Sequence, residues 1–221
     1  LQKILSILYE ISNSISYTLD YDDLILRIMD SLHQIVDYDI CTSLVIPGEE
    51  KNPKMVIRIA HPIKRKIVED VKRKVINALD SLRGEPLTEK DIILDLKGEI
   101  SDDNPALPDH IKSSFDVPLF VRDKGVGVLN VTSLKDIVYS DEEIKLLYTL
   151  ASQASAAIER LQAVLAAEKS KMKVMVEGMS EGVVMFDEQD RVVMMNTVAK
   201  EMLGENIDLI GPLEEIKKYH H

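Results

Sequence analysis

The chain has 221 residues, of which 45% are hydrophobic and 29% are charged, and its formal net charge is −11. This length and composition are typical of a soluble globular protein with one large domain or two small ones. No stretch approaches the roughly 18 consecutive apolar residues of a membrane span. The negative charge would repel a phosphate backbone. We therefore expect neither direct membrane contact nor nucleic acid binding.

The sequence contains one cysteine, Cys41, so it offers no intramolecular disulfide and no cysteine-rich zinc site. This usage suits the reducing cytoplasm, where we expect the protein to be located. Cys41 lies in the apolar run 40–46, which predicts a buried structural thiol and not a nucleophile. The chain begins at Leu1, and we expect it to be a piece of a longer protein whose final histidines are a remnant of a purification tag.

The first half of the chain alternates between helical and strand patterns. Apolar residues at steps of three and four predict helices over 2–19 and about 22–37. Strands follow over 38–46 and 55–60, and the next helical pattern covers 63–82 and ends at Gly84. Six cations on this last helix indicate its solvent face, with an anion-binding surface as the alternative: Lys64, Arg65, Lys66, Lys72, Arg73 and Lys74.

The next segments indicate a hairpin and then a long helix. A short strand over 91–96 and a loop over 97–111 precede strands at 114–121 and 126–133, joined by a turn at 122–125. Ser140 and Glu143 have the spacing of a capping box, and no proline or glycine follows until Gly178. A helix of roughly 38 residues, about 57 Å long, exceeds a compact domain of this size, so its far half should project.

After Gly182 the helical pattern ends and short strands are predicted. Strands are predicted over 183–186 and 191–195, with a turn between them. Asn196 or Thr197 then caps a short helix that ends at Gly204. The few residues that remain are too short to complete a sheet domain. The whole pattern predicts an α+β fold with an antiparallel sheet of five or six strands and helices on both faces.

Several segments resemble a GAF domain: Asp116-Val117-Pro118-Leu119 through Gly125, then 126–131, then 139–147 and 150–160. They are similar to that family's last two strands and final helix. The resemblance covers about residues 1–165, with a helical stem from 140, and is followed by a connecting signalling helix over 166–179. It implies a ligand cavity between the 63–82 helix and the sheet.

Residues 173–204 are similar to the start of a PAS domain, so 180–221 is expected to be a truncated PAS-like domain. A GAF domain followed by a PAS domain implies a modular sensor, as found upstream of histidine kinases, diguanylate cyclases and ATP-dependent transcriptional activators. No catalytic motif or phosphate-binding loop is visible, so we expect no enzyme activity from this segment.

The resemblance also implies a set of ligand-binding positions. The expected cavity wall comprises Arg58, His61, Ile93, Phe115, Asp116 and Val117. Cyclic-nucleotide-binding GAF domains carry an Asn-Lys pair, but Asn130 is followed here by Val131, so we do not expect that ligand. His61 and His110 are isolated imidazoles, so we predict no haem, metal or other cofactor, although a small-molecule ligand in the pocket is expected.

The long helix carries an apolar stripe that predicts a parallel homodimer. Its members are Leu147, Leu150, Ala154, Ala157, Leu161, Leu165, Met172 and Met175. Two consecutive steps of four around Leu161 form a stutter, and Glu168 interrupts the stripe beyond it. We expect a signal in the pocket to pass through this stem to the PAS domain and an output domain. The alternatives are a ligand-free dimerisation scaffold, or a regulatory segment of a cyclase or transcriptional activator.

Overall fold

The structure is a computed structural model that describes residues 20–48, 52–137, 139–187 and 192–203. The chain divides into two compact units, 1–162 and 163–221. The helix predicted over 2–19 and the segment after Leu203 lie outside the described residues. The domain boundaries expected from the sequence, after residues 165 and 179, stay predictions.

The first unit contains a five-stranded sheet in the order β3-β2-β1-β5-β4. The strands are β1 (Ile40–Val45), β2 (Lys54–Ile59), β3 (Ile93–Lys97), β4 (Ser113–Val121) and β5 (Lys124–Ser133). Three neighbouring pairs are antiparallel, but β3 runs parallel to β2. The expectation of a wholly antiparallel sheet is therefore wrong at this edge. Helix α3 (Arg65–Arg83) and the short 3-10 helix η1 (Glu89–Asp91) lie between β2 and β3 in the chain, and such a crossover allows the second strand to run parallel to the first.

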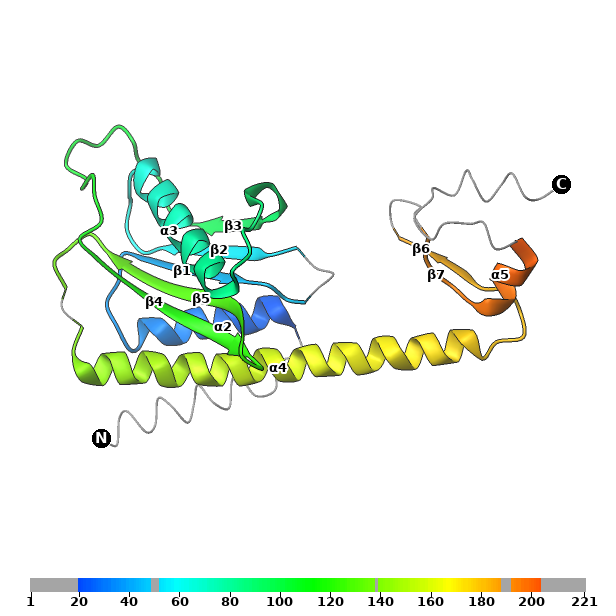
Figure 1. The fold of residues 1–221 in the computed structure, drawn as a ribbon. Helices are drawn as coiled ribbons and strands as arrows, with labels where there is room; N and C mark the ends of the chain where they lie inside the picture. The colour runs from blue at the N-terminus through cyan, green and yellow to red at the C-terminus, as the bar shows by residue number, and fades with distance from the viewer. Residues whose placement is uncertain (1–19, 49–51, 138, 188–191, 204–221) are drawn as a thin grey trace. The chain divides into compact units, whose positions relative to one another are not determined.

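Helices cover both faces of this sheet, as predicted. Helix α3 (Arg65–Arg83) packs on one face, and α2 (Tyr21–His33) with the first half of α4 (Asp141–Glu177) packs on the other (Figure 1). The core under α3 is built from alternate strand residues and one apolar stripe of the helix: Ile40, Leu44, Met55, Ile57, Ile67, Val71, Val75, Leu79 and Val128. The cations of α3 lie outside this stripe, which confirms the amphipathic interpretation.

Helix α4 begins with the predicted capping box. The Ser140 backbone nitrogen donates to the Glu143 carboxylate at 2.7 Å, and the Glu143 nitrogen donates to Ser140 Oγ at 3.3 Å. Five members of the predicted dimer stripe are buried inside the first unit of a single chain: Leu147, Leu150, Ala154, Ala157 and Leu161, each at most 4% exposed. The domain's own core therefore accounts for their apolar character, and they need no second chain to cover them.

The hairpin β4–β5 turns more tightly than predicted. Only Arg122 and Asp123 lie between the two strands, and both have positive φ, at 47° and 64°. This is the signature of a type I′ turn, whose twist matches that of the strands. A β-bulge between Leu119 and Phe120 then shifts the register by one residue, and this shift places Asp116 opposite Asn130.

The second unit contains the end of α4, the strands β6 (Val184–Phe186) and β7 (Val192–Met195), and helix α5 (Thr197–Leu203). The two strands form an antiparallel pair, as predicted. A small apolar cluster joins them to α5: Val192, Met195 and Ala199, with Val184 and Leu203 packed against it.

Candidate functional site

Polar side chains gather on the sheet face that α3 covers. Thr42 of β1 lies opposite Asn130 of β5, which in turn lies opposite Asp116 of β4. Residues directly opposite in a sheet share a face, and Val128, two residues before Asn130, packs in the core beneath α3. We call this set the polar cluster: Thr42, Ser114, Asp116, Asn130, Thr132 and Lys74 of α3.

Hydrogen bonds connect most of the polar cluster. Asn130 Nδ2 donates to Ser114 Oγ at 2.9 Å and to Asp116 Oδ1 at 2.6 Å. Asn130 Oδ1 accepts from Thr132 Oγ1 at 2.7 Å, and the hydroxyl oxygens of Ser114 and Thr132 lie 3.1 Å apart. Asn130 and Thr132 are fully buried, so these bonds offset the cost of removing their polar groups from water.

Three groups of the polar cluster retain capacity for a further partner. Thr42 Oγ1 is buried without a hydrogen bond among the described residues. Asp116 Oδ2 lies 3.7 Å from Lys74 Nζ, a loose ion pair between half-exposed side chains of the kind that contributes about 0–1 kcal/mol. The cluster can therefore offer a hydroxyl, a carboxylate and an ammonium group to a small polar molecule, but it contains no nucleophile with an adjacent base.

The loop over 97–111 is pinned to the first turn of α3. The Arg65 backbone nitrogen donates to Asp102 Oδ1 at 2.7 Å, so Asp102 caps the helix from 37 residues away. Lys64 Nζ donates to Asp109 Oδ1 at 2.5 Å, and this bond holds the pKa of the Asp109 carboxyl below its usual range. Local sequence patterns could not reveal this cap, because the loop residue is distant in the chain.

Two of the expected wall residues lie on the opposite face of the sheet. Phe115 stacks edge-to-face on Tyr139 and Tyr148, at centroid distances of 6.2 and 6.1 Å. Val117 is buried on the same side as Phe115, because side chains alternate along a strand. Among neighbours 115–117, only Asp116 therefore faces α3, and placing all three at one pocket was wrong.

Arg58 also lies on the face away from α3. It is opposite Cys41 in the sheet and donates through Nη2 to Asp95 Oδ2 at 3.1 Å. This hydrogen bond lowers the pKa of the Asp95 carboxyl. The expectation that Arg58 lines the α3 pocket is wrong, since strand alternation puts Ile57 and Ile59 there instead.

Ile93 and His61 are both exposed, Ile93 at 54% on the edge strand β3 and His61 in the loop after β2. They do not join the polar cluster, and His110 is likewise exposed in its loop. Whether any of the six expected wall residues binds a ligand stays a prediction.

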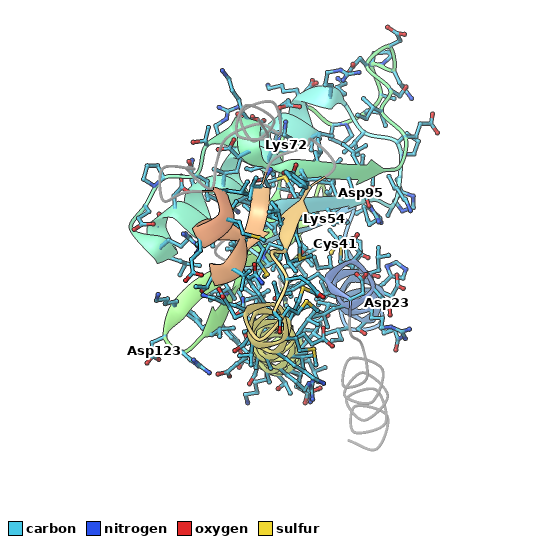
Figure 2. All side chains as sticks on the ribbon, turned by 90° about the vertical axis from the view of Figure 1, so that its right-hand side faces the viewer. Asp23, Cys41, Lys54, Lys72, Asp95 and Asp123 are labelled. Atoms are coloured by element: carbon cyan, nitrogen blue, oxygen red, sulfur yellow. The ribbon has the colours of Figure 1, made fainter. Side chains whose placement is uncertain are left out.

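Cys41 is buried, as predicted, and lies among packed side chains in the interior, whereas Asp123 lies at the periphery (Figure 2). Burial raises the pKa of the Cys41 thiol far above its usual value, so the thiolate is not populated at neutral pH.

Within the described ranges, no three or more histidine, cysteine, aspartate or glutamate side chains gather as a metal site would require. The described helices also include none that is long and apolar enough to cross a membrane.

The GAF domain family model matches residues 20–158, which is more than half of the chain. The chain belongs to the GAF domain family. A PAS domain model matches residues 170–219, directly after the GAF domain. The GAF domain thus comprises the five-stranded sheet with α2, α3 and the first part of α4, and the polar cluster lies inside it.

Solved structures similar to this chain include several GAF domains. One from an Acinetobacter phosphoenolpyruvate-protein phosphotransferase is 18% identical, with a TM-score of 0.46, and covers 72% of this chain and 95% of its own. One from a two-component sensor histidine kinase of Bacillus halodurans is 18% identical, with a TM-score of 0.40, and covers 66% and 99%. The bacteriophytochrome RpBphP3 of R. palustris is 10% identical, with a TM-score of 0.49, and covers 81% and 43%. No curated protein sequence matches the chain.

Sequence reasoning missed most of the GAF polar cluster, although a signal was present. Asn130 and Thr132 are polar at alternate positions of an otherwise apolar strand, as are Ser114 and Asp116 in the preceding strand. The two-residue turn at 122–123, together with the β-bulge between Leu119 and Phe120, sets these pairs opposite each other. Without the bulge, Asp116 would lie opposite Leu129 and on the other face from Asn130. The turn and strand alternation alone therefore do not predict that the four polar residues meet.

Proposed function

We propose that the chain is the sensory and regulatory module of a cytoplasmic signalling protein, which passes a signal from the GAF domain through α4 to the PAS segment and a downstream output domain. The observation that carries this proposal is that α4 belongs to both units. Its first half is buried in the GAF core, and its last turn is bonded to Asn196, whose side chain also bonds to Val183, just before β6, and to Ala199 of α5. We expect no catalysis in this segment. The output domain is a histidine kinase, a diguanylate cyclase or a transcriptional activator.

Inside the GAF domain, a short chain of contacts leads from the polar cluster to α4. Asp116 lies on β4, and four residues later the Phe120 nitrogen donates to Ser155 Oγ on α4 at 3.1 Å. At the hairpin tip, Arg122 Nε donates to Glu159 Oε1 at 3.1 Å. A ligand that draws on Asp116 would displace β4, and these two bonds would carry the displacement to α4.

The double variant Ser155→Ala/Glu159→Ala removes both bonds and tests this path in the full-length protein with its native output. We expect it to keep the basal output and lose the response to the stimulus. Ser152→Ala/Glu142→Ala makes the same chemical changes at exposed positions of α4 without bonds to the hairpin, and should respond normally. A normal response from the first variant would show that the hairpin does not carry the signal.

A parallel homodimer through the second half of α4 is part of the proposal. Met172 and Met175 are 49% and 56% exposed in a single chain, one turn apart on one face, and a second copy would remove them from water. Sedimentation velocity tests it: Met175→Glu should raise the dimer dissociation constant by about tenfold or more, because it buries a charge. Val174→Glu, on another face of the helix, should leave this dissociation constant unchanged.

Glu168→Leu should tighten the dimer and lock the full-length output in one state.

A ligand-free scaffold is the second candidate, and it is favoured by one observation. Both amide donors of Asn130 are already used within the polar cluster. Native mass spectrometry of the protein from its own cells separates the two functions. A sensory function predicts that a small molecule is bound to the wild type and to Asp123→Ala but is lost from Asp116→Ala. A scaffold function predicts no bound molecule in any of the three.

A further inference from the structure

Asn196 lies at the junction between β7 and α5, and its side chain is fully buried. Its amide makes four hydrogen bonds, all to backbone atoms. Nδ2 donates to the Val176 carbonyl at 3.1 Å and to the Glu181 carbonyl at 2.8 Å. Oδ1 accepts from the Val183 nitrogen at 2.8 Å and from the Ala199 nitrogen at 2.9 Å. Two donors and two acceptor positions are the full capacity of an amide side chain.

These four bonds join segments with different roles. The two donor bonds hold the last turn of α4 and the connection after it, whereas the two acceptor bonds hold the start of β6 and the first turn of α5. A helix cap needs only the bond to Ala199. The donor side of the amide is therefore available for a separate task, which is to fix the end of α4.

Glu177, the last residue of α4, makes a second tie to the same place. Its Oε2 accepts from the backbone nitrogen and from Oγ1 of Thr197, each at 2.9 Å. The backbone hydrogen bond, followed by that from the hydroxyl, lowers the pKa of the Glu177 carboxyl, so the bonds are present at neutral pH. Asn196 and Glu177 thus hold the end of α4 from inside and from the surface.

We propose that Asn196 and Glu177 are positioning residues that form a coupling joint, which fixes the last turn of α4 to β7 and α5 and makes them move together. The joint deepens the proposed function, since a relay through α4 needs a rigid connection at its end. Asn196 would act by its donor bonds, and its acceptor bonds would maintain the local fold.

Asn196→Asp separates these two roles. The carboxylate keeps oxygen acceptors for the Val183 and Ala199 nitrogens but turns an acceptor toward the Val176 and Glu181 carbonyls, which would repel it. Asn196→Ala removes all four bonds. Glu177→Ala removes the surface tie. Glu201→Ala is its control, because Glu201 is an exposed carboxylate on α5 with no bond to another described residue.

Amide hydrogen exchange of the 221-residue chain measures which tie each variant breaks. In Asn196→Asp we expect exchange at Gly178 and Met179, whose amides bond to α4 carbonyls, to rise at least about tenfold, while Val183 and Ala199 stay protected. In Asn196→Ala all four should rise. If Asn196→Asp leaves Gly178 and Met179 unchanged, or exposes all four equally, the division of roles is wrong.

A distance measurement separates positioning from simple stabilisation. With spin labels at Lys171 on α4 and Val193 on β7, both exposed, the wild type should give one narrow distance distribution. Asn196→Asp and Glu177→Ala should broaden it at a temperature where the unit remains folded, whereas Glu201→Ala should not. An unchanged distribution in both variants would overturn the joint.

The full-length protein distinguishes failure of the joint from failure of the relay. A variant with a broadened distance distribution but a normal response to the stimulus would support the coupling joint and contradict the proposed relay. A variant with an unchanged distance distribution but a lost response would contradict the coupling joint and remain consistent with the relay.

Discussion

Two glycines of the GAF domain should differ strongly in the stability cost of their replacement by alanine. Gly98 has φ +130°, and a Cβ added to it would lie 2.4 Å from Ile59 Cβ, whereas a Cβ on Gly48 meets nothing within 4 Å. Gly98→Ala should lower the free energy of unfolding by about 2–4 kcal/mol, from backbone strain and overpacking together. Gly48→Ala should change it by less than about 0.5 kcal/mol. Urea denaturation measures both, and equal effects would contradict this placement of Gly98.

The hairpin tip offers a stabilising substitution. Asp123 occupies the second central position of the type I′ turn, with φ 64°, a position that strongly favours glycine. Asp123→Gly should raise the free energy of unfolding by about 0.5–1 kcal/mol, because relief of the left-handed strain exceeds glycine's entropy cost. Lys124→Gly, one residue into β5, should lower it. A loss of stability in Asp123→Gly would mean that the turn has another type.

At the scale of elements, the remote cap on α3 is testable with a neighbouring control. Asp102→Ala should destabilise the GAF domain by about 0.5–2 kcal/mol, the usual cost of losing an N-cap. Asp102→Asn should lose less, since asparagine also caps helices well. Asp103→Ala removes the same charge from an exposed residue that makes no bond within the described ranges, and should change stability by less than about 0.5 kcal/mol. Thermal melts of the three variants decide whether Asp102 caps α3.

The positions of helices and strands could be predicted wherever a short sequence signal determines them. The stripe of α3 ends at Gly84, whose φ of 72° is the left-handed conformation that closes a helix, and the Ser140–Glu143 box starts α4. Both signals involve residues within a few positions of each other. Element type and position could therefore be predicted without tertiary information.

The sheet face on which a side chain lies, and the direction of one strand, could not be predicted so directly. The expected pocket wall includes Phe115, Asp116 and Val117, although alternation along a strand places the first and third on the face that α4 covers. The periodicity of α4 predicts a dimer seam, although five of its eight apolar residues pack inside the domain. Sequence periodicity shows that a face is buried, but it does not say against what.

The methionines are unevenly distributed over the whole molecule. Seven of the nine lie between residues 172 and 202: Met172, Met175, Met179, Met185, Met194, Met195 and Met202. The two in the GAF domain, Met29 and Met55, are 2% and 0% exposed. The GAF core thus uses methionine as buried packing, whereas four of the seven in the second unit are exposed to solvent, where a thioether is open to oxidants: Met172, Met175, Met179 and Met202.

Hydrogen peroxide should therefore oxidise the exposed methionines of the second unit selectively, in protein dilute enough to be monomeric. Each reaction transfers one oxygen atom from the peroxide to the thioether sulfur, giving a sulfoxide and water. We expect Met172, Met175 and Met202, which are 49%, 56% and 76% exposed, to react well before Met29 and Met55. Met195, 4% exposed in the same unit, is the internal control for burial. Peptide mass spectrometry over a time course measures the order of oxidation, and equal rates at Met55 and Met175 would contradict it.

Because sulfoxides are polar, oxidation should also weaken the proposed dimer at the seam that contains Met172 and Met175. Sedimentation of the oxidised protein tests this.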